Sequence, residues 1–367
     1  MIVKGIELKN FRNYADLNIE FHEKVNVFTG KNAQGKTNLL ESIYISSFGK
    51  SFRQGNDNEM IQFGEKFCKV KIDAVRGGME TSVEIAIGEN EKGIKADGVK
   101  IKKISELLEK ILIVVFSPDD LVIVKGEPEK RRRFIDRELS QIRPSYYSDL
   151  YSYKRALLQR NALLKDKSAG DEAFEIWDGK LTEFGERVIL KRNEFIKKLN
   201  KISGEIHKDI TNGKESLEVI YDSTIPISEN LKEIFLFKLK EGLKNDIFRG
   251  STEAGPHRDD LKLRIDGADI RKYGSQGQQR TAALSLKLAE LKLIREETGE
   301  DAVLLLDDVL SELDSERQNF LIRSFGNIQL FITAAELNDS MIKKLPEGYL
   351  FNIMNGVAEK ARTFYKS

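Results

Sequence analysis

The sequence predicts an α/β fold, a mixed sheet with helices, into which an α-helical lobe is inserted. Three observations indicate this. A glycine-rich segment at 30–37 lies between a strand-like run and a helical stripe. An apolar run at 303–306 ends in two aspartates, and the pattern from about 129 to 212 is helical. We therefore divide the chain into residues 1–125, 126–213 and 214–367, with the first and third parts forming one head.

The first 125 residues are predicted to be mainly strands. Short β-rich runs are separated by Arg76-Gly77-Gly78 and by Asp97-Gly98, which are typical of hairpin turns. Residues 25–28 form a short strand, and residues 111–116 form a buried one.

The segment after the first of these two strands fits the phosphate-binding pattern G-x-x-x-x-G-K-[ST] at every fixed position. Such a loop wraps its N–H groups around phosphates, and the helix that follows points its N-terminus at them. Lys36 would reach the β- and γ-phosphates, and the Thr37 hydroxyl would hold Mg²⁺. An ordinary glycine-rich turn is the alternative. The predicted ATP-binding residues are Gly30, Lys31, Asn32, Ala33, Gln34, Gly35, Lys36 and Thr37.

Two amphipathic helices are predicted between 129 and 212, with a polar break at 165–171. The second could span about 40 residues, or roughly 60 Å. The pair suggests an antiparallel arm, with too few heptads for a long coiled coil. Residues 125–212 carry a net charge of +5. That charge is compatible with contacts to a phosphate backbone, or with a solvated helix face.

Strands and helices alternate again after Leu217. Residues 261–265 and 302–306 are predicted as strands and 276–297 as a helix. Asn355-Gly356 lies between two strand-like runs, at 349–354 and 357–365, and predicts a hairpin.

The apolar strand at 303–306 delivers two carboxylates to its end. Asp307 could hold Mg²⁺ through its water shell, and Asp308 could orient or deprotonate the attacking water. Two aspartates could also simply cap the next helix, but together with the loop at 30–37 they indicate a nucleotide site. Lys36, Asp307 and Asp308 are the candidate catalytic residues, and Thr37 and Asp307 the candidate Mg²⁺ ligands.

The segment Tyr273 to Arg280 resembles the signature motif of the ABC-type ATPases. In that class the motif of one subunit binds the γ-phosphate held by the loop of another. The resemblance implies a contact in trans from Ser275, Gln276, Gly277 and Gln278; a polar helix cap is the alternative. Ser311 to Asp314 looks like the D-loop of the class. Thr333 stands where transporters usually have a switch histidine, which argues against a transporter subunit.

A finer resemblance, to the RecF family of bacterial recombination mediators, covers nearly the whole chain. It is carried by five motifs in the same order: Leu8 to Tyr14, Phe116 to Asp136, Gly255 to Asp260, Tyr273 to Arg280, and Leu305 to Asp314. The first motif implies that Arg12 lies near the nucleotide. The short helical arm also fits, since structural-maintenance-of-chromosomes proteins have far longer coiled coils there.

The resemblance implies an ATP-dependent DNA-binding protein of recombinational repair and replication-fork maintenance. Two copies would clamp two ATP molecules, and the homodimer would bind double-stranded DNA near single-stranded gaps. RecO and RecR would be partners in loading RecA. Hydrolysis, Mg²⁺-dependent and DNA-stimulated, would release the DNA. We expect it to be slow, because Asp308 is one methylene shorter than the usual glutamate.

The composition sets further limits. The net charge is +1, the single cysteine, Cys68, suits a reducing compartment, and no apolar run approaches 18 residues. We see no leader sequence and expect a cytoplasmic protein without membrane contact.

His257 fits a hydrogen-bonded turn better than a catalytic base. Arg131, Arg132 and Arg133 could touch DNA phosphates or pair with the carboxylates Glu127, Glu129 and Asp136.

Three other functions stay open from the residues: a transporter-type ATPase subunit, a small-molecule P-loop kinase, and a nucleotide-gated scaffold in which hydrolysis is incidental. A signature motif at Ser275 has no purpose in a small-molecule kinase. The sequence does not identify the residues that contact DNA.

Overall fold

The computed structural model describes residues 1–53, 55–121, 123–166, 170–336 and 339–365. The chain forms two compact units, unit 1 with residues 1–121 and 290–367, and unit 2 with residues 122–289. Their second boundary falls inside helix α9 (Gln276–Thr298). The division predicted near 125 lies close to the first boundary. The one near 213 falls inside unit 2, where β9 (Leu217–Asp222) packs on α6 (Asp171–Ile210).

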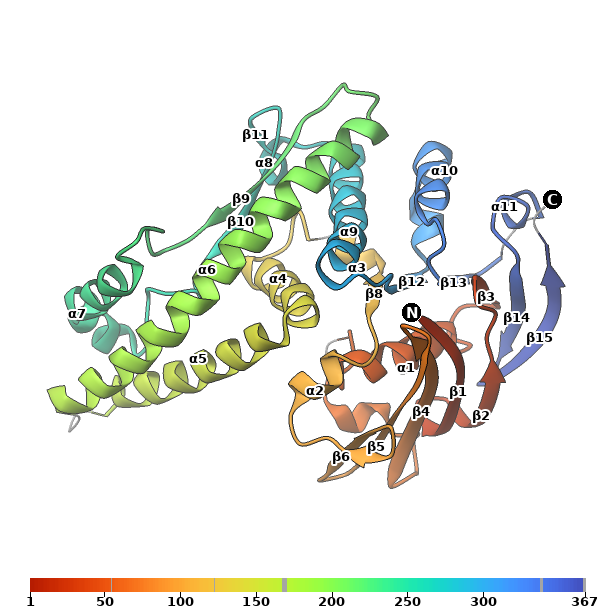
Figure 1. The fold of residues 1–367 in the computed structure, drawn as a ribbon, viewed down its shortest axis with the longest axis horizontal. Coiled ribbons are helices and arrows are strands. Elements are labelled where there is room, and N and C mark those ends of the chain that lie inside the picture. Colours follow the sequence, from red (N-terminus) through yellow and green to blue (C-terminus); the bar gives the residue numbers. More distant parts are fainter. Residues whose placement is uncertain (54, 122, 167–169, 337–338, 366–367) are drawn as a thin grey trace. The chain divides into compact units, whose positions relative to one another are not determined.

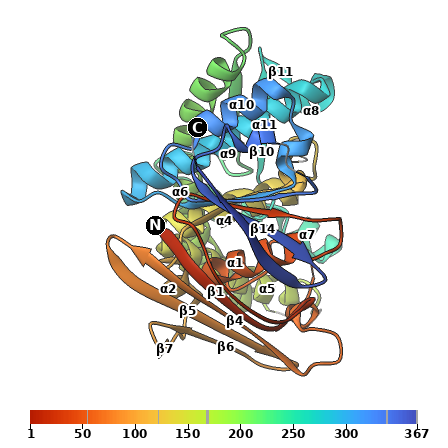
Figure 2. The same cartoon turned by 90° about the vertical axis from the view of Figure 1, so that its right-hand side faces the viewer.

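Unit 1 contains an antiparallel sheet in the order β2-β1-β4-β5-β6-β7, of which Figure 2 labels β1, β4, β5, β6 and β7. The turns predicted at Gly77-Gly78 and Asp97-Gly98 are confirmed as the β4–β5 and β6–β7 connections. Both residues of each turn have positive φ, as a tight hairpin requires. The strands are β1 (Ile2–Phe11), β2 (Tyr14–Glu20), β4 (Phe67–Arg76), β5 (Met79–Gly88), β6 (Lys92–Ala96) and β7 (Val99–Lys100).

The second sheet of unit 1 has the order β15-β14-β3-β13-β12-β8. In its described residues β14, β3, β13, β12 and β8 are mutually parallel, and β15 is antiparallel to β14. The strands are β3 (Val25–Thr29), β8 (Ile113–Phe116), β12 (Val303–Asp307), β13 (Leu330–Ala334), β14 (Gly348–Met354) and β15 (Val357–Phe364). Because parallel strands end at one edge, residues after β3, β12 and β13 come together there.

Helices of unit 1 complete its core. Buried apolar side chains of α1 (Lys36–Phe48) belong to one cluster with residues of both sheets. The smaller helical elements are η1 (Asp57–Met60), α2 (Ile104–Leu108), α3 (Pro118–Leu121), η2 (Val309–Glu312), α10 (Ser315–Ser324) and α11 (Asp339–Ile342).

Unit 2 is mainly helical, with a small sheet in the order β11-β10-β9. The 40-residue length predicted for the second arm helix is confirmed by α6. It pairs antiparallel with α5 (Pro144–Leu163), as the ion pairs Arg143–Glu194 and Arg160–Asp178, both 2.6 Å, establish (Figure 1). The predicted polar break includes residues 167–169, which lie outside the described residues. The other elements are α4 (Pro128–Ile142), α7 (Leu231–Arg249), β10 (Asp260–Ile265), β11 (Ala268–Asp269) and α8 (Ile270–Tyr273).

Across the ranges given above, we find no helix with the length and apolar character needed to cross a bilayer.

A buried arginine ties three helices of unit 2 together. The Arg160 guanidinium of α5 is fully buried and donates to Asp178 of α6 at 2.6 Å and to Asp246 of α7 at 2.7 Å. It also donates to the Thr252 hydroxyl at 2.7 Å. A buried charge persists only when its donors are satisfied, so this network fixes how the helices pack.

The segment Gly255 to Asp260, one of the motifs of the sequence, joins the elements of unit 2. The Pro256 carbonyl accepts from buried Arg192 of α6 at 2.6 Å. Asp259 accepts from the Thr224 backbone after β9, and Asp260 forms a bidentate ion pair with Arg131 of α4. These contacts give the motif a structural role within unit 2.

His257, in the same segment, is hydrogen-bonded at both ring nitrogens. Nε2 lies 2.8 Å from the Thr252 carbonyl, which can only accept, so Nε2 carries the proton. Nδ1 therefore accepts from the Tyr153 hydroxyl at 2.6 Å. The imidazole is neutral, and burial lowers its pKa to about 4. The hydrogen-bonded turn favoured by the sequence is thus what the structure contains.

This neutral imidazole predicts that the protein loses stability as the pH falls. His257 binds a proton near pH 6.5 in the unfolded chain but only near pH 4 in the folded chain. Its contribution to the free energy of unfolding is therefore fully present above pH 6.5 and is lost as the pH falls toward 4. The loss at pH 5 should be about 2 kcal/mol. Urea unfolding of wild type and His257→Gln at pH 7, 6 and 5 tests this. The variant should have the weaker pH dependence, and identical slopes would contradict the prediction.

Candidate nucleotide site

The phosphate loop of unit 1 connects the end of β3 to the start of α1. Gly30 and Gly35 have φ angles of 148° and 115°, which favour glycine. A Cβ on Gly30 would lie 2.3 Å from the Ile353 carbonyl oxygen, so no larger residue fits there. The backbone therefore reaches the N-terminus of α1 in the sharp turn that the glycine spacing predicts.

Lys36 lies within the curve of this loop. The residue is 4% exposed, and Nζ donates to the carbonyls of Gly30 at 2.8 Å and Lys31 at 3.1 Å. The ammonium is thus placed beside the loop backbone and the N-terminus of α1, where an anion is favoured.

Asp307 is the centre of a buried polar cluster at the carboxyl ends of β3, β12 and β13. Its Oδ1 accepts from the Thr37 hydroxyl at 2.8 Å and from the Thr333 hydroxyl at 2.9 Å. Burial raises the pKa of this carboxyl, and the two hydroxyl donors oppose the rise. The structure therefore brings together Thr37 and Asp307, which the sequence places 270 positions apart.

The donor set fits Mg²⁺. Thr37 and Asp307 supply a hydroxyl and a carboxylate oxygen, the hard ligands that Mg²⁺ prefers, and it commonly keeps waters and substrate phosphates as the others. A bound cation would also offset the cost of burying Asp307. In the described residues no group of three or more His, Cys, Asp or Glu side chains forms an all-protein metal site.

Asp308 follows in a left-handed conformation, with φ 53° and ψ 16°. Its backbone N–H donates to the Thr333 hydroxyl at 2.9 Å, and its carbonyl accepts from the Ser311 hydroxyl at 2.7 Å. Asp314, at the end of the predicted D-loop, caps α10 through the backbone N–H of Arg317. Thr333 thus orients both aspartates, a role that the sequence reasoning, which considered Thr333 only as a missing histidine, did not find.

Arg12 lies next to the loop helix. Its guanidinium forms a bidentate ion pair with the fully buried Glu41 of α1, at 2.7 and 2.9 Å, and donates to the Glu59 carbonyl at 2.6 Å. Arg53 lies 3.7 Å from the same carboxylate. The Arg12 side chain in this structure anchors α1, and contact with nucleotide stays a prediction.

Two neighbours of Arg12 touch the loop itself. The Asn13 side-chain amide donates to the Gln34 carbonyl at 2.9 Å, and the Tyr14 hydroxyl donates to the Gly35 carbonyl at 3.0 Å. Asn38 of α1 holds the Asn13 side chain in place at 2.7 Å. Sequence reasoning missed these contacts, because their only signal was the position of both residues within the Leu8 to Tyr14 motif.

The signature residues lie in unit 2, at the start of α9. The Ser275 N–H donates to the Gln278 side chain at 2.9 Å, and the Gln278 N–H donates to the Ser275 hydroxyl at 3.2 Å. This is a reciprocal capping box, so the cap considered as an alternative is present. Ser275 and Gln276 are nevertheless exposed, which leaves the helix N-terminus open to an anion.

The three consecutive arginines of α4 have different environments. Arg131 is buried and pairs with Asp260, whereas Arg132 donates to the Asp259 carbonyl at 2.8 Å. Arg133 is exposed and pairs with Glu129 at 3.1 Å. Of the carboxylate pairings considered for them, only that of Arg133 with Glu129 occurs among the described residues.

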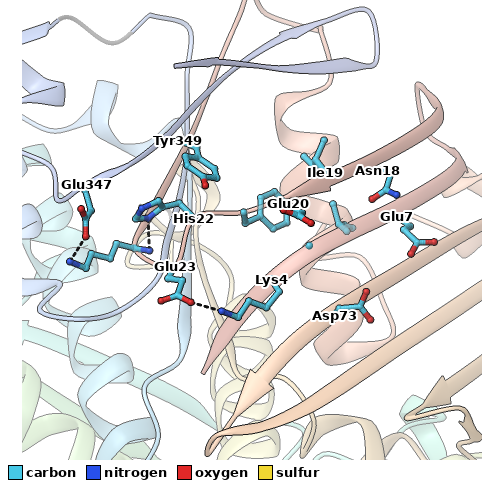
Figure 3. Close-up of a pocket in the computed structure, with 14 residues that line it drawn as sticks. Lys4, Glu7, Asn18, Ile19, Glu20, His22, Glu23, Asp73, Glu347 and Tyr349 are labelled. Carbon is cyan, nitrogen blue, oxygen red and sulfur yellow. Dashed lines mark hydrogen bonds and ion pairs between the residues drawn. The ribbon is translucent and has the colours of Figure 1, made fainter. Parts of the chain in front are cut away.

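A polar groove also lies on unit 1, lined by residues of β1, β2 and the β2–β3 connection, with Asp73 of β4 and Tyr349 of β14 (Figure 3). Two ion pairs join residues of its lining: Lys4 contacts Glu23, and Lys24 donates to Glu347 at 2.7 Å. The phosphate loop follows the opposite end of β3, so this groove is separate from the nucleotide site.

Comparison with known proteins identifies the family. A model described as the RecF/RecN/SMC N terminal domain matches residues 2–355. A protein named DNA replication and repair protein RecF from Alkaliphilus oremlandii is 44% identical, over 97% of this chain and 99% of its own length. One of the same name from Clostridioides difficile is 43% identical, over 97% of each chain. The chain belongs to the RecF family.

Solved structures of the RecF family match the whole fold. A structure titled as the recombination mediator protein RecF-ATP in the RecFOR pathway has a TM-score of 0.92 and 40% identity, and covers 98% of both chains. An Smc head domain from Pyrococcus furiosus, 17% identical with a TM-score of 0.56, shares the fold alone. The predicted fold class, an ABC-type ATPase head with a helical lobe, is confirmed.

The position of Thr333 generates a prediction. Thr333→Val keeps the shape but removes the hydroxyl that contacts Asp307 and the Asp308 N–H, so Asp307 should hold Mg²⁺ less well. We expect the Mg²⁺ concentration for half-maximal ATP hydrolysis to rise about tenfold, the value of one hydrogen bond to a charged group. Thr333→Ser, which keeps the hydroxyl, should resemble wild type. Equal Mg²⁺ dependence of the valine variant and wild type would contradict this role.

Proposed function

We propose that this chain binds and hydrolyses ATP with Mg²⁺, and that ATP joins two copies into a dimer that binds duplex DNA near single-stranded gaps. The observation that carries the proposal is the cluster of Thr37, Asp307 and Thr333 beside the phosphate loop. The loop can bind an anion and the cluster can bind a cation, and the two lie together at one edge of a parallel sheet.

The residues of the nucleotide site have distinct roles in this proposal. Lys36 and the loop N–H groups hold the β- and γ-phosphates, while Thr37 and Asp307 hold Mg²⁺, which neutralises phosphate charge when bound. Asp308 orients the attacking water and accepts its proton. Its short side chain makes this placement less effective than a glutamate would, so turnover is slow. Arg12 lies near the nucleotide.

The dimer uses the start of α9. Its N-terminus carries partial positive charge, and the exposed Ser275 and Gln276 leave that end accessible. The γ-phosphate held by the loop of one subunit is bound by Ser275, Gln276, Gly277 and Gln278 of the other. The Ser275–Gln278 capping box supports this, because it presents the helix end in a fixed conformation.

The biological role rests on the relatives. Those of about 43% identity are named DNA replication and repair proteins, and the solved relatives are described as recombination mediators of the RecFOR pathway. We infer the same pathway for this chain, with RecO and RecR as partners in loading RecA, in the cytoplasm. DNA-stimulated hydrolysis opens the dimer and releases the DNA.

DNA binding should depend on ATP and on Ser275. Fluorescence anisotropy would compare blunt and gapped duplexes with ATP, with ADP, and with Ser275→Arg. Wild type should bind more tightly with ATP than with ADP, and more tightly to the gapped duplex. Ser275→Arg should bind ATP as a monomer but lose this gain, because a bulky cation blocks the shared site.

Ser228→Arg is the matched control, since it adds the same charge at another exposed serine of unit 2. It should bind DNA as wild type does. ATP-dependent dimers that persist in Ser275→Arg, seen by sedimentation, would exclude the shared site. If ATP drives dimerisation but the protein binds DNA in no nucleotide state, the ATPase acts on a partner other than DNA.

Asp308→Asn separates a hydrolysing enzyme from a nucleotide-gated scaffold. The amide keeps the size of the side chain but cannot accept the proton, so turnover should fall about a hundredfold or more while ATP affinity changes little. The variant should accumulate as an ATP-bound dimer that releases DNA slowly. Normal repair activity in cells carrying only this variant would show that turnover is dispensable.

A further inference from the structure

The tip of the C-terminal hairpin lies directly on the phosphate loop. The turn between β14 and β15 consists of Asn355 and Gly356, and both of its N–H groups donate to Gln34. The Gly356 N–H reaches the Gln34 carbonyl at 3.2 Å, and the Asn355 N–H reaches its side-chain oxygen at 2.8 Å. One loop residue therefore receives both N–H donors of a turn that lies far away in the sequence.

The N-terminal hairpin contacts the same residue. The Asn13 amide, in the turn between β1 and β2, also donates to the Gln34 carbonyl, at 2.9 Å. That oxygen thus accepts from both hairpins and is held toward them. A phosphate cradle needs its carbonyls turned outward, because an inward carbonyl would repel the anion that the N–H groups must bind.

The two hairpin tips also pack against one another. A Cβ added to Gly356 would lie only 2.0 Å from the Asn13 carbonyl oxygen. Real Cβ atoms do not approach an oxygen so closely, so glycine is required both for its φ of 76° and for this contact. The turn cannot stay against Asn13 with any other residue at position 356.

The loop needs this support because its backbone is strained. Ala33, the residue before Gln34, has a φ of 64°, a left-handed conformation that is unfavourable for alanine. The three donors to Gln34 hold the adjacent peptide in place against this strain.

We propose that the Asn355-Gly356 turn and Asn13 form a positioning clamp that holds the Gln34 carbonyl away from the phosphates. The clamp keeps the loop N–H groups available to bind the β-phosphate. The inference rests on the proposed ATP binding and adds the C-terminal hairpin to the nucleotide site.

Gly356→Ala tests the clamp, with Gly98→Ala as its matched control. Gly98 is the second residue of a similar hairpin turn, with a φ of 78° and nothing within 4 Å of an added Cβ. Both substitutions therefore place an alanine at a similar positive φ, with the same conformational cost. Only in Gly356→Ala does the added Cβ clash with the Asn13 carbonyl and push the hairpin away from the phosphate loop. Equilibrium binding of fluorescent ADP and ATP analogues, measured without turnover, should be about tenfold weaker in Gly356→Ala. Gly98→Ala should bind as wild type does.

Asn13→Ala provides a second test that leaves the C-terminal hairpin in place. It should weaken ADP and ATP binding by similar factors, because both nucleotides carry the β-phosphate. Asn18→Ala, at an exposed position of β2, is its control. Thermal unfolding without nucleotide shows whether each variant is folded at the assay temperature.

The outcomes separate this inference from the proposed function. If wild type binds neither nucleotide, the proposed function fails and the clamp with it. If wild type binds while folded Gly356→Ala and Asn13→Ala bind equally well, the clamp is refuted and the proposed function stands. Weaker binding in both variants, with both controls unchanged, supports the clamp.

Discussion

The buried carboxylate of Asp307 is the constraint on which the nucleotide site depends. A carboxylate removed from water needs donors, and here the hydroxyls of Thr37 and Thr333 supply them. Each of the three residues lies at or near the end of a different structural segment: Asp307 ends β12, Thr333 is the last residue but one of β13, and Thr37 is the second residue of the helix after β3. Because both hydroxyls donate to the same oxygen, Oδ1 of Asp307, these hydrogen bonds fix the positions of the three segments relative to one another. The same bonds place the loop and the two aspartates within reach of one ligand.

Buried charge organises the rest of the protein in a similar way. In unit 1 the fully buried Glu41 holds Arg12, which ties the β1–β2 turn to the loop helix. In unit 2 Arg160 joins three helices, and Asp260 joins its strand to α4 through Arg131. Several of these residues belong to the motifs that carry the family resemblance. A motif residue can thus serve to position the elements of its own unit, and His257, which is hydrogen-bonded at both ring nitrogens, is the clearest case.

The features that depend on local pattern were mostly predictable from the sequence. The phosphate loop, the 40-residue helix and the hairpin turns each have a signal within a few residues, such as a fixed glycine spacing or an Asn-Gly pair. The bounds of helix α7 were not predicted. Phe237 and Phe248 lie on its exposed side, at 65% and 90% exposure, and apolar residues there obscure the periodicity by which an amphipathic helix is recognised. The roles of Asn13 and Thr333 also escaped, because they depend on strands brought together only by the fold. A threonine near the end of a strand carries no local sign of the aspartate that it will contact.

The long-range construction of the loop links nucleotide binding to the folding of unit 1. The backbone of the phosphate loop is held by residues near both ends of the described chain, Asn13 and Gly356 among them. An unfolded chain cannot assemble those donors, so nucleotide binds the folded unit far better than the unfolded one. By mass action, a nucleotide at about 100 times its dissociation constant then stabilises unit 1 by about 2.7 kcal/mol. In a monomer unit 2 gains nothing directly from that term, because its Ser275 to Gln278 segment would meet a nucleotide only in the dimer. In a monomer, therefore, the stability of unit 1 should follow nucleotide concentration, while that of unit 2 is set by its own buried charge network.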